Sequence, residues 1–247
     1  MKQRKIIGHR GAAGLELENT ATSIERALHL HVSAIELDLR LTKDDRLVVL
    51  HDSDLARVAN NPHKARNLTL SELKKIRLLD GSEILSLPEA LRIIGTTPVI
   101  LELKDTDSAR LLLKELKKFP QAKVSVASFK LNELALLRSL APTMHLYALE
   151  LTKPFESIQL ASMLDLDGIG LNFWLLNPLT YHYARRKKLK IYVFTLNRKF
   201  IARFISWLYP TVAICTDHPE WFVKKPHPLR RKKKGQAHAS HLRTRRQ

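Results

Sequence analysis

Apolar segments of β type alternate with amphipathic segments along most of this chain, and that alternation constrains its fold more than any other feature. In segments such as 107–119 and 131–140, apolar residues recur every three or four positions, as on one face of a helix. The eight β-type segments span residues 5–9, 34–39, 98–103, 123–127, 145–149, 167–171, 190–195 and 212–216. Eight strands that alternate with helices close into a (β/α)8 barrel, which commonly takes about 250 residues. The 247-residue chain is therefore predicted to be an α/β protein with TIM-barrel architecture.

A ninth β-type segment, "RLVVLH" at 46–51, interrupts the alternation. Only "RLTKDD" separates it from the segment at 34–39, whereas a parallel crossover needs a dozen residues or more. We expect an antiparallel hairpin here, after the second barrel strand, followed by loop and helices over 52–97. Two helix starts fit the capping-box pattern, Thr69 with Glu72 and Asp217 with Glu220.

The net charge of +18 is concentrated at one end of the chain. Residues 224–247 contain ten Lys or Arg and no Asp or Glu, without apolar periodicity. Such a segment is typical of disorder, so we expect a barrel domain over 1–223 and a basic, disordered tail over 224–247. The rest of the chain is still moderately basic, which favours an anionic substrate or surface.

The compartment is predicted to be the cytoplasm. The single cysteine, Cys215, excludes an internal disulfide, and no apolar stretch follows the basic start as it would in a secretory signal. The longest segment without charge, 168–184, contains asparagines, a proline and a histidine, which makes it a poor membrane span.

Charged residues gather where the predicted barrel strands end. The carboxyl ends of barrel strands form the active-site face of this fold. Glu36 and Asp38 are two positions apart on a strand, so they point to the same face. The full set at these ends is His9, Arg10, Glu36, Asp38, His51, Asp52, Glu102 and Lys104.

Carboxylates that converge on one barrel mouth repel each other, by about 4 kcal/mol for unit charges ~4 Å apart at an effective dielectric of ~20. The site must therefore protonate a carboxylate or bind a cation, and oxygen ligands favour one Mg²⁺ or Ca²⁺ over zinc. Arg10 and Lys104 suit a phosphate, while His9 and His51 titrate near neutrality and can act as acid and base. The combination indicates phosphoryl-transfer chemistry. Each motif alone fits a plainer reading, such as a solvated strand face for Glu36 and Asp38.

The segments "IIGHRGAAGLELENT", "AIELDLRLTKDDRLVVLHD" and "VILELK", in this order and spacing, closely resemble glycerophosphodiester phosphodiesterases. "VFTLN" and "ICTDHPE" resemble the family's last two barrel strands, so the similarity spans about residues 5–222. The resemblance implies a TIM barrel that hydrolyses deacylated phospholipids to glycerol 3-phosphate and an alcohol with a divalent cation. It implies that Glu36, Asp38 and Glu102 bind the metal and that His9 and His51 are the acid/base pair. Arg10 and Lys104 would hold the phosphate, with Glu18 as a supporting polar residue.

Two alternatives stay open. A lysophospholipase D-like enzyme would keep this fold and cleave head groups from lysophospholipids. A polyanion-binding protein would act through its basic tail, although binding alone needs no such set of histidines and carboxylates. We expect a small-molecule substrate, no specific nucleic-acid partner, and at most weak contact between the tail and anionic membranes.

Overall fold

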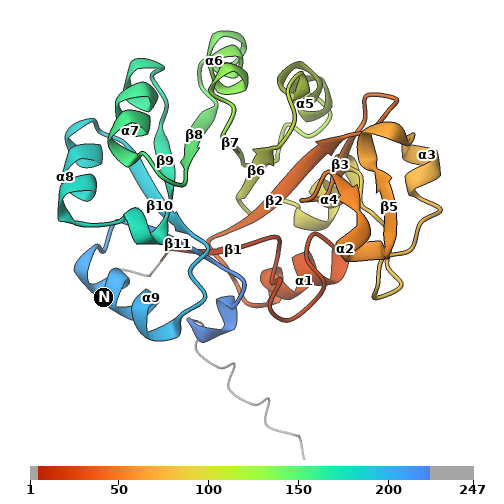
Figure 1. Ribbon diagram of the computed structural model, residues 1–247, viewed down its shortest axis with the longest axis horizontal. Coiled ribbons are helices and arrows are strands. Elements are labelled where there is room, and N and C mark those ends of the chain that lie inside the picture. Colours follow the sequence, from red (N-terminus) through yellow and green to blue (C-terminus); the bar gives the residue numbers. More distant parts are fainter. Residues whose placement is uncertain (1–4, 223–247) are drawn as a thin grey trace, which may run out of the picture.

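Eight parallel strands close into a barrel in the computed structural model, which describes residues 5–222 (Figure 1). The first strand, β1, pairs with both its successor β2 and the last strand β11, and this double pairing closes the ring. Each predicted barrel strand is present within two residues of its expected bounds. The strands are β1 (Ile6–Gly8), β2 (Ala34–Leu41), β6 (Val99–Leu103), β7 (Val124–Ser128), β8 (His145–Glu150), β9 (Gly168–Asn172), β10 (Lys190–Phe194) and β11 (Ala213–Thr216). The predicted tail, 224–247, lies outside the described residues.

Helices follow most barrel strands and cover the outside of the barrel (Figure 1). They are α1 (Ala21–His29), α4 (Leu87–Ile94), α5 (Ser108–Leu116), α6 (Leu131–Leu140), α7 (Pro154–Met163), α8 (Pro178–Arg186) and α9 (Lys199–Leu208). The apolar periodicity at 107–119 and 131–140 therefore predicted α5 and α6 correctly. No helix among residues 5–222 combines the length and apolar character needed to cross a bilayer.

The hairpin after the second strand is confirmed. The short strand β3 (Leu47–Val49) runs antiparallel to the end of β2, with Leu41 opposite Leu47 and Leu39 opposite Val49. The segment that follows holds α2 (Ala56–Ala59), a 3₁₀ turn (Ala65–Asn67) and α3 (Leu70–Leu73), beside the barrel (Figure 1). It also holds a two-stranded sheet of β4 (Asp54–Leu55) and β5 (Asn61–Lys64). The sequence did not predict this sheet, because β4 is too short to show alternation and β5 contains Pro62.

One of the two predicted capping boxes is present. Thr69 accepts a hydrogen bond from the Glu72 amide at the start of α3, and the Glu72 side chain accepts one from the Thr69 amide. The box at Asp217 and Glu220 is wrong. The short 3₁₀ helix there (Pro219–Trp221) begins after His218 without a side-chain cap, and the Asp217 carboxylate is hydrogen-bonded to His9 instead.

Alternation along the barrel strands separates two environments. On β2, Ile35, Leu37 and Leu39 pack into the layer between strands and helices. Glu36 and Asp38 point the other way, into the barrel. Apolar side chains fill the rest of the interior, which includes Ile7, Ile100, Ala127, Leu149, Tyr192 and Cys215.

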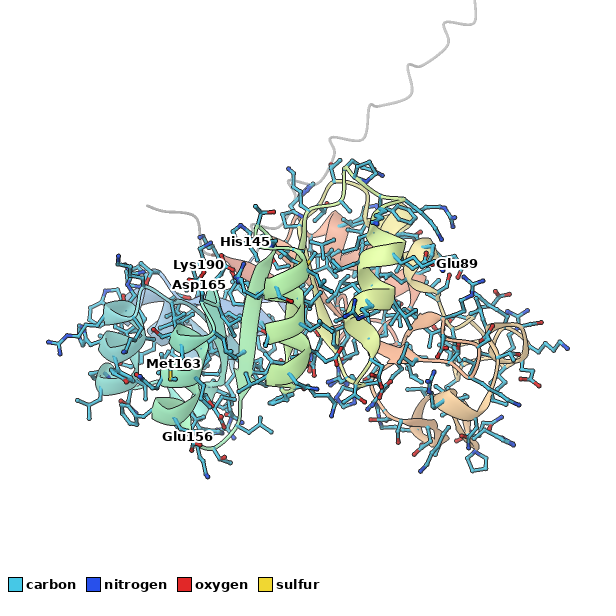
Figure 2. All side chains as sticks on the ribbon, turned by 90° about the horizontal axis from the view of Figure 1, so that it is seen from above. Glu89, His145, Glu156, Met163, Asp165 and Lys190 are labelled. Atoms are coloured by element: carbon cyan, nitrogen blue, oxygen red, sulfur yellow. The ribbon has the colours of Figure 1, made fainter. Side chains whose placement is uncertain are left out.

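The two ends of the barrel are distinguished in Figure 2. His145 and Lys190, which begin β8 and β10, lie at one end, and Glu156, in the first turn of α7, lies at the other. The loops that leave the carboxyl ends of the strands share the Glu156 end, which we call the mouth. Every residue predicted for the site lies in a strand or loop on this side.

Candidate active site

The segment after β1 turns sharply at the mouth. Arg10 and Gly11 both have positive φ, +50° and +89°. A Cβ at Gly11 would lie 2.3 Å from Ser23 Oγ, so only glycine fits the turn. The Ser23 hydroxyl donates to the Arg10 carbonyl at 2.7 Å, and the Arg10 amide donates to Glu36 Oε2 at 3.0 Å. The glycines therefore bring the His9-Arg10 pair against the carboxylates of β2.

Glu36, Asp38 and Glu102 form one cluster inside the mouth. Asp38 is in register with Glu102 across the parallel pair β2–β6. One oxygen from each of the three carboxylates lies within 4.8 Å of the others. All three residues are buried, so the two strands that carry them bring together the charges that the sequence predicted would converge.

The donor set fits a hard cation. Each carboxylate offers a buried oxygen. Glu36 Oε1 has no hydrogen-bond partner among residues 5–222, whereas Asp38 Oδ1 and Glu102 Oε1 lie beside the Lys104 ammonium. Burial raises the pKa of Glu36 and of Glu102 above the usual range, and the Asp38 charge raises both further. A divalent cation among these oxygens would remove that penalty and give Glu36 Oε1 a partner, because Mg²⁺ and Ca²⁺ prefer oxygen ligands.

Two basic side chains contact the cluster. Lys104 Nζ lies 2.9 Å from Asp38 Oδ1 and 2.5 Å from Glu102 Oε1, and Arg10 Nε lies 3.1 Å from Asp38 Oδ2. Burial alone would raise the pKa of Asp38, but Lys104 and Arg10 hold it well below its usual range. Both basic side chains therefore lie at the site, where they face carboxylates.

The motif Glu18-Asn19-Thr20 has a separate role for each residue. Thr20 caps α1, because its hydroxyl accepts from the Ser23 amide. The side-chain amide of Asn19 donates through Nδ2 to Asp38 Oδ2 at 2.9 Å. Glu18 Oε1 accepts a hydrogen bond from Arg10 Nη1 at 3.0 Å and another from Arg57 Nη2 at 2.7 Å. Glu18 therefore holds the guanidinium of Arg10 beside the cluster.

Each histidine is held by a carboxylate at Nδ1. His9 Nδ1 donates to Asp217 Oδ1 at 2.6 Å, and His51 Nδ1 donates to Asp52 Oδ1 at 2.7 Å. These bonds leave Nε2 of each ring for other partners, and His9 Nε2 lies 4.0 Å from Glu36. The carboxylates therefore fix both rings in one tautomer and orientation.

The surroundings of the two rings shift their pKa values in opposite directions. Burial alone would lower the pKa of His9, but the hydrogen bond to Asp217 and the Glu36 charge raise it above its ordinary value. Burial also lowers the pKa of His51, and Lys104 and Arg10 add to that effect, so the value stays below the ordinary one. Environments that separate two such pKa values are typical of an acid and a base.

Three residues of this network were not predicted from the sequence: Asn19, Arg57 and Asp217. Asp217 follows β11, the neighbour of β1, so its place at a strand end was a usable signal. The pairing of Asp217 with Glu220 as a possible cap obscured it. Arg57 lies in α2 and reaches both Asp52 and Glu18, a contact that no local pattern indicates.

Comparison with known proteins agrees with this geometry. The sequence profile of the "Glycerophosphoryl diester phosphodiesterase family" matches residues 9–119, which contain the histidines, the carboxylate cluster and both cations. The glycerophosphodiester phosphodiesterase of Caldanaerobacter subterraneus subsp. tengcongensis is 27% identical over 237 residues, which cover 88% of this chain and 96% of that protein. The chain belongs to the glycerophosphodiester phosphodiesterase family.

Other relatives of this phosphodiesterase extend the comparison. The human protein named Lysophospholipase D GDPD1 is 40% identical over 80 residues, 31% of this chain and 24% of that protein. The solved structure of a glycerophosphodiester phosphodiesterase from Thermotoga maritima superposes with a TM-score of 0.78 at 27% identity, over 90% of this chain and 98% of the other. An Oleispira antarctica phosphodiesterase, solved with sn-glycerol-3-phosphate, has a TM-score of 0.81 at 22% identity over 88% and 94% of the two chains, and it supports the shared TIM barrel.

Proposed function

We propose that this enzyme hydrolyses glycerophosphodiesters to glycerol 3-phosphate and an alcohol, with one divalent cation, Mg²⁺ or Ca²⁺. The observation that carries the proposal is the juxtaposition of three buried carboxylates with two carboxylate-held histidines. The comparisons support the substrate class. The Caldanaerobacter relative, which this chain matches over 96% of its length, is named a glycerophosphodiester phosphodiesterase.

The residues divide the work as follows. Glu36, Asp38 and Glu102 would hold the cation, which supplies positive charge to offset the phosphate. One imidazole of the His9–His51 pair removes the proton from the attacking hydroxyl, either water or the glycerol 2-hydroxyl. As the attacking oxygen bonds to phosphorus, the P–O bond to the head group breaks and the other imidazole donates a proton to the departing alkoxide. If the glycerol 2-hydroxyl attacks, the product is a cyclic phosphate, which water then opens to glycerol 3-phosphate with the two histidine roles reversed. The pKa directions favour His9 as the acid and His51 as the base.

Arg10 and Lys104 would neutralise the non-bridging phosphate oxygens, Arg10 as a planar fork and Lys104 as a point charge. Glu18 would keep the Arg10 guanidinium in place. Water must reach the mouth for hydrolysis, and His51 and Asp52 are only partly buried there.

Release of glycerol 3-phosphate from a panel of glycerophosphodiesters, with and without added Mg²⁺ or Ca²⁺, tests the proposal. Glycerophosphocholine and glycerophosphoethanolamine should both be cleaved, and EDTA should abolish turnover. His9→Ala should lose most activity, and retention of it would remove His9 from the acid/base pair. Lysophosphatidylcholine in the same panel separates the lysophospholipase D-like alternative.

A further inference from the structure

The loops at the mouth differ sharply between the two halves of the barrel. The catalytic groups come from β1, β2, β3, β6 and β11. The loops after β7, β8, β9 and β10 instead expose large apolar side chains. We call this set the apolar rim: Phe129, Leu151, Phe155, Trp174, Leu179 and Phe200.

The apolar rim is continuous because its strands are neighbours. β7 pairs with β8, β8 with β9, and β9 with β10, so the four loops lie side by side. Trp174 is 68% exposed and Phe200 84% exposed. The Arg198 guanidinium lies 5.9 Å from the Trp174 ring centre, which joins the β9 and β10 loops. An exposed set of this kind marks an interaction surface rather than scattered surface residues.

The apolar rim also reaches the catalytic groups. The Phe129 ring is 6.2 Å from that of Phe194, the last residue of β10. The next residue, Thr195, lies 3.4 Å from His9 Nε2 through its hydroxyl. A molecule seated on the apolar rim is therefore next to the reaction site.

Charge decides what the apolar rim can contact. The rim loops, residues 129–131, 151–156, 173–179 and 195–200, contain Lys130, Lys153, Arg198 and Lys199 and one acidic residue, Glu156, whose carboxylate lies 3.6 Å from Lys153 Nζ. Four basic residues and one acidic residue leave these loops with a net charge of +3. Two copies placed rim to rim would bring these cations together and repel. Aromatic side chains mixed with Lys and Arg are instead typical of surfaces that sit at the head-group level of anionic lipid.

We propose that the apolar rim docks on a lipid surface, with the mouth turned toward the head groups. The identity of the substrate at that surface rests on the proposed function. The phosphodiester would belong to a lysophospholipid or similar lipid taken from the surface, with its acyl chain against the apolar rim. The soluble diester would reach the same catalytic groups without docking.

Tryptophan fluorescence tests the docking independently of catalysis. The chain has three tryptophans, so the double variant Trp207→Phe with Trp221→Phe leaves only Trp174. Vesicles of equal parts phosphatidylcholine and phosphatidylglycerol with brominated acyl chains should quench it. Contact of the basic tail with head groups would not, because bromine in the acyl region quenches only inserted rings.

The matched control leaves only Trp207, by Trp174→Phe with Trp221→Phe. Trp207 is slightly more exposed than Trp174, at 74%, but α9 runs away from the mouth and carries it roughly 12 Å beyond Lys199. Interfacial insertion reaches about 5–10 Å, so Trp207 should be quenched little. Equal quenching of Trp174 and Trp207 would overturn the docking geometry, and so would the absence of quenching at Trp174. A dimer of the wild type that Phe200→Ser dissociates would also overturn it, because the apolar rim would then bind a second copy.

The catalytic arm uses Phe200→Ser. Turnover of lysophosphatidylcholine vesicles or micelles should fall about tenfold, the scale of one lost apolar side chain, while glycerophosphocholine turnover stays unchanged. Equal loss on both substrates would contradict a lipid role for Phe200. If neither substrate is cleaved by the wild type but Trp174 is quenched, the proposed function fails and the docking stands.

Discussion

Asp217→Asn tests whether the carboxylate at His9 Nδ1 contributes to turnover. The substitution keeps the shape of the side chain and removes the charge that lies 2.6 Å from the ring. A hydrogen bond to a charged group contributes about 1.5–3 kcal/mol. At 1.36 kcal/mol for each factor of ten, kcat should fall roughly 10- to 100-fold. Because Asp217 is a main reason that the pKa of His9 is raised, the variant should also lower that pKa.

The assay is glycerol 3-phosphate release from glycerophosphocholine between acid and alkaline pH. The limb of the rate profile that His9 controls should move to lower pH, whereas a merely structural role would lower the rate without moving it. The matched control is Asp167→Asn, which breaks a similar pair, His145 Nδ1 to Asp167 Oδ1 at 2.7 Å, at the far end of the barrel. A normal kcat and an unmoved profile in Asp217→Asn would refute the positioning role.

Three further results are expected. Glu36→Gln should abolish turnover and the rise in melting temperature that Mg²⁺ or Ca²⁺ gives the wild type; a variant that keeps that rise would contradict the ligand assignment. Although burial raises the pKa of Glu150, hydrogen bonds from Ser157 and the amides before α7 lower it to about 2. The stabilisation by Glu150 is therefore present above its unfolded pKa of about 4.5 and is lost as pH falls toward 2. In urea titrations, Glu150→Gln should lower the free energy of unfolding by about 1 kcal/mol at neutral pH. The variant should also show a flatter decline of that free energy between pH 4.5 and pH 2. Removal of residues 226–247 should leave glycerophosphocholine turnover largely intact, and a collapse of turnover would give the tail a catalytic role.

The barrel was predictable because its signals are local and repeated. Every strand is an apolar run bounded by polar residues, and the short connection at 40–45 excluded a parallel crossover, which left only the hairpin of β2 and β3. The small sheet of β4 and β5 was not predictable. Asp54 and Leu55 are too few to show a period, and Pro62 within β5 argues against a strand.

The candidate site was predictable to the extent that strand ends define it. The two-residue period alone places Glu36 and Asp38 on one face of β2. The register of the pair β2–β6 then sets Glu102 opposite Asp38. The partners that orient these groups were not predictable. Asp217 is 208 positions from His9, and only closure of the ring makes them neighbours. The sequence therefore indicated the carboxylates and histidines that cluster at the mouth, and not the groups that hold them.

The contacts of Lys104 and Arg10 indicate that cation binding and phosphate binding are coupled. Both basic groups now face carboxylates, Lys104 toward Asp38 and Glu102, and Arg10 toward Asp38 and Glu18. A phosphate that drew them away would leave buried carboxylates without opposite charge, which is strongly unfavourable. A divalent cation held by Glu36, Asp38 and Glu102 would replace that charge, and Lys104 and Arg10 would then be available to the phosphate. Glycerol 3-phosphate should therefore bind at least tenfold more tightly with the cation than without it in calorimetric titrations, and equal affinities would show that the two cationic side chains are not shared between carboxylates and phosphate.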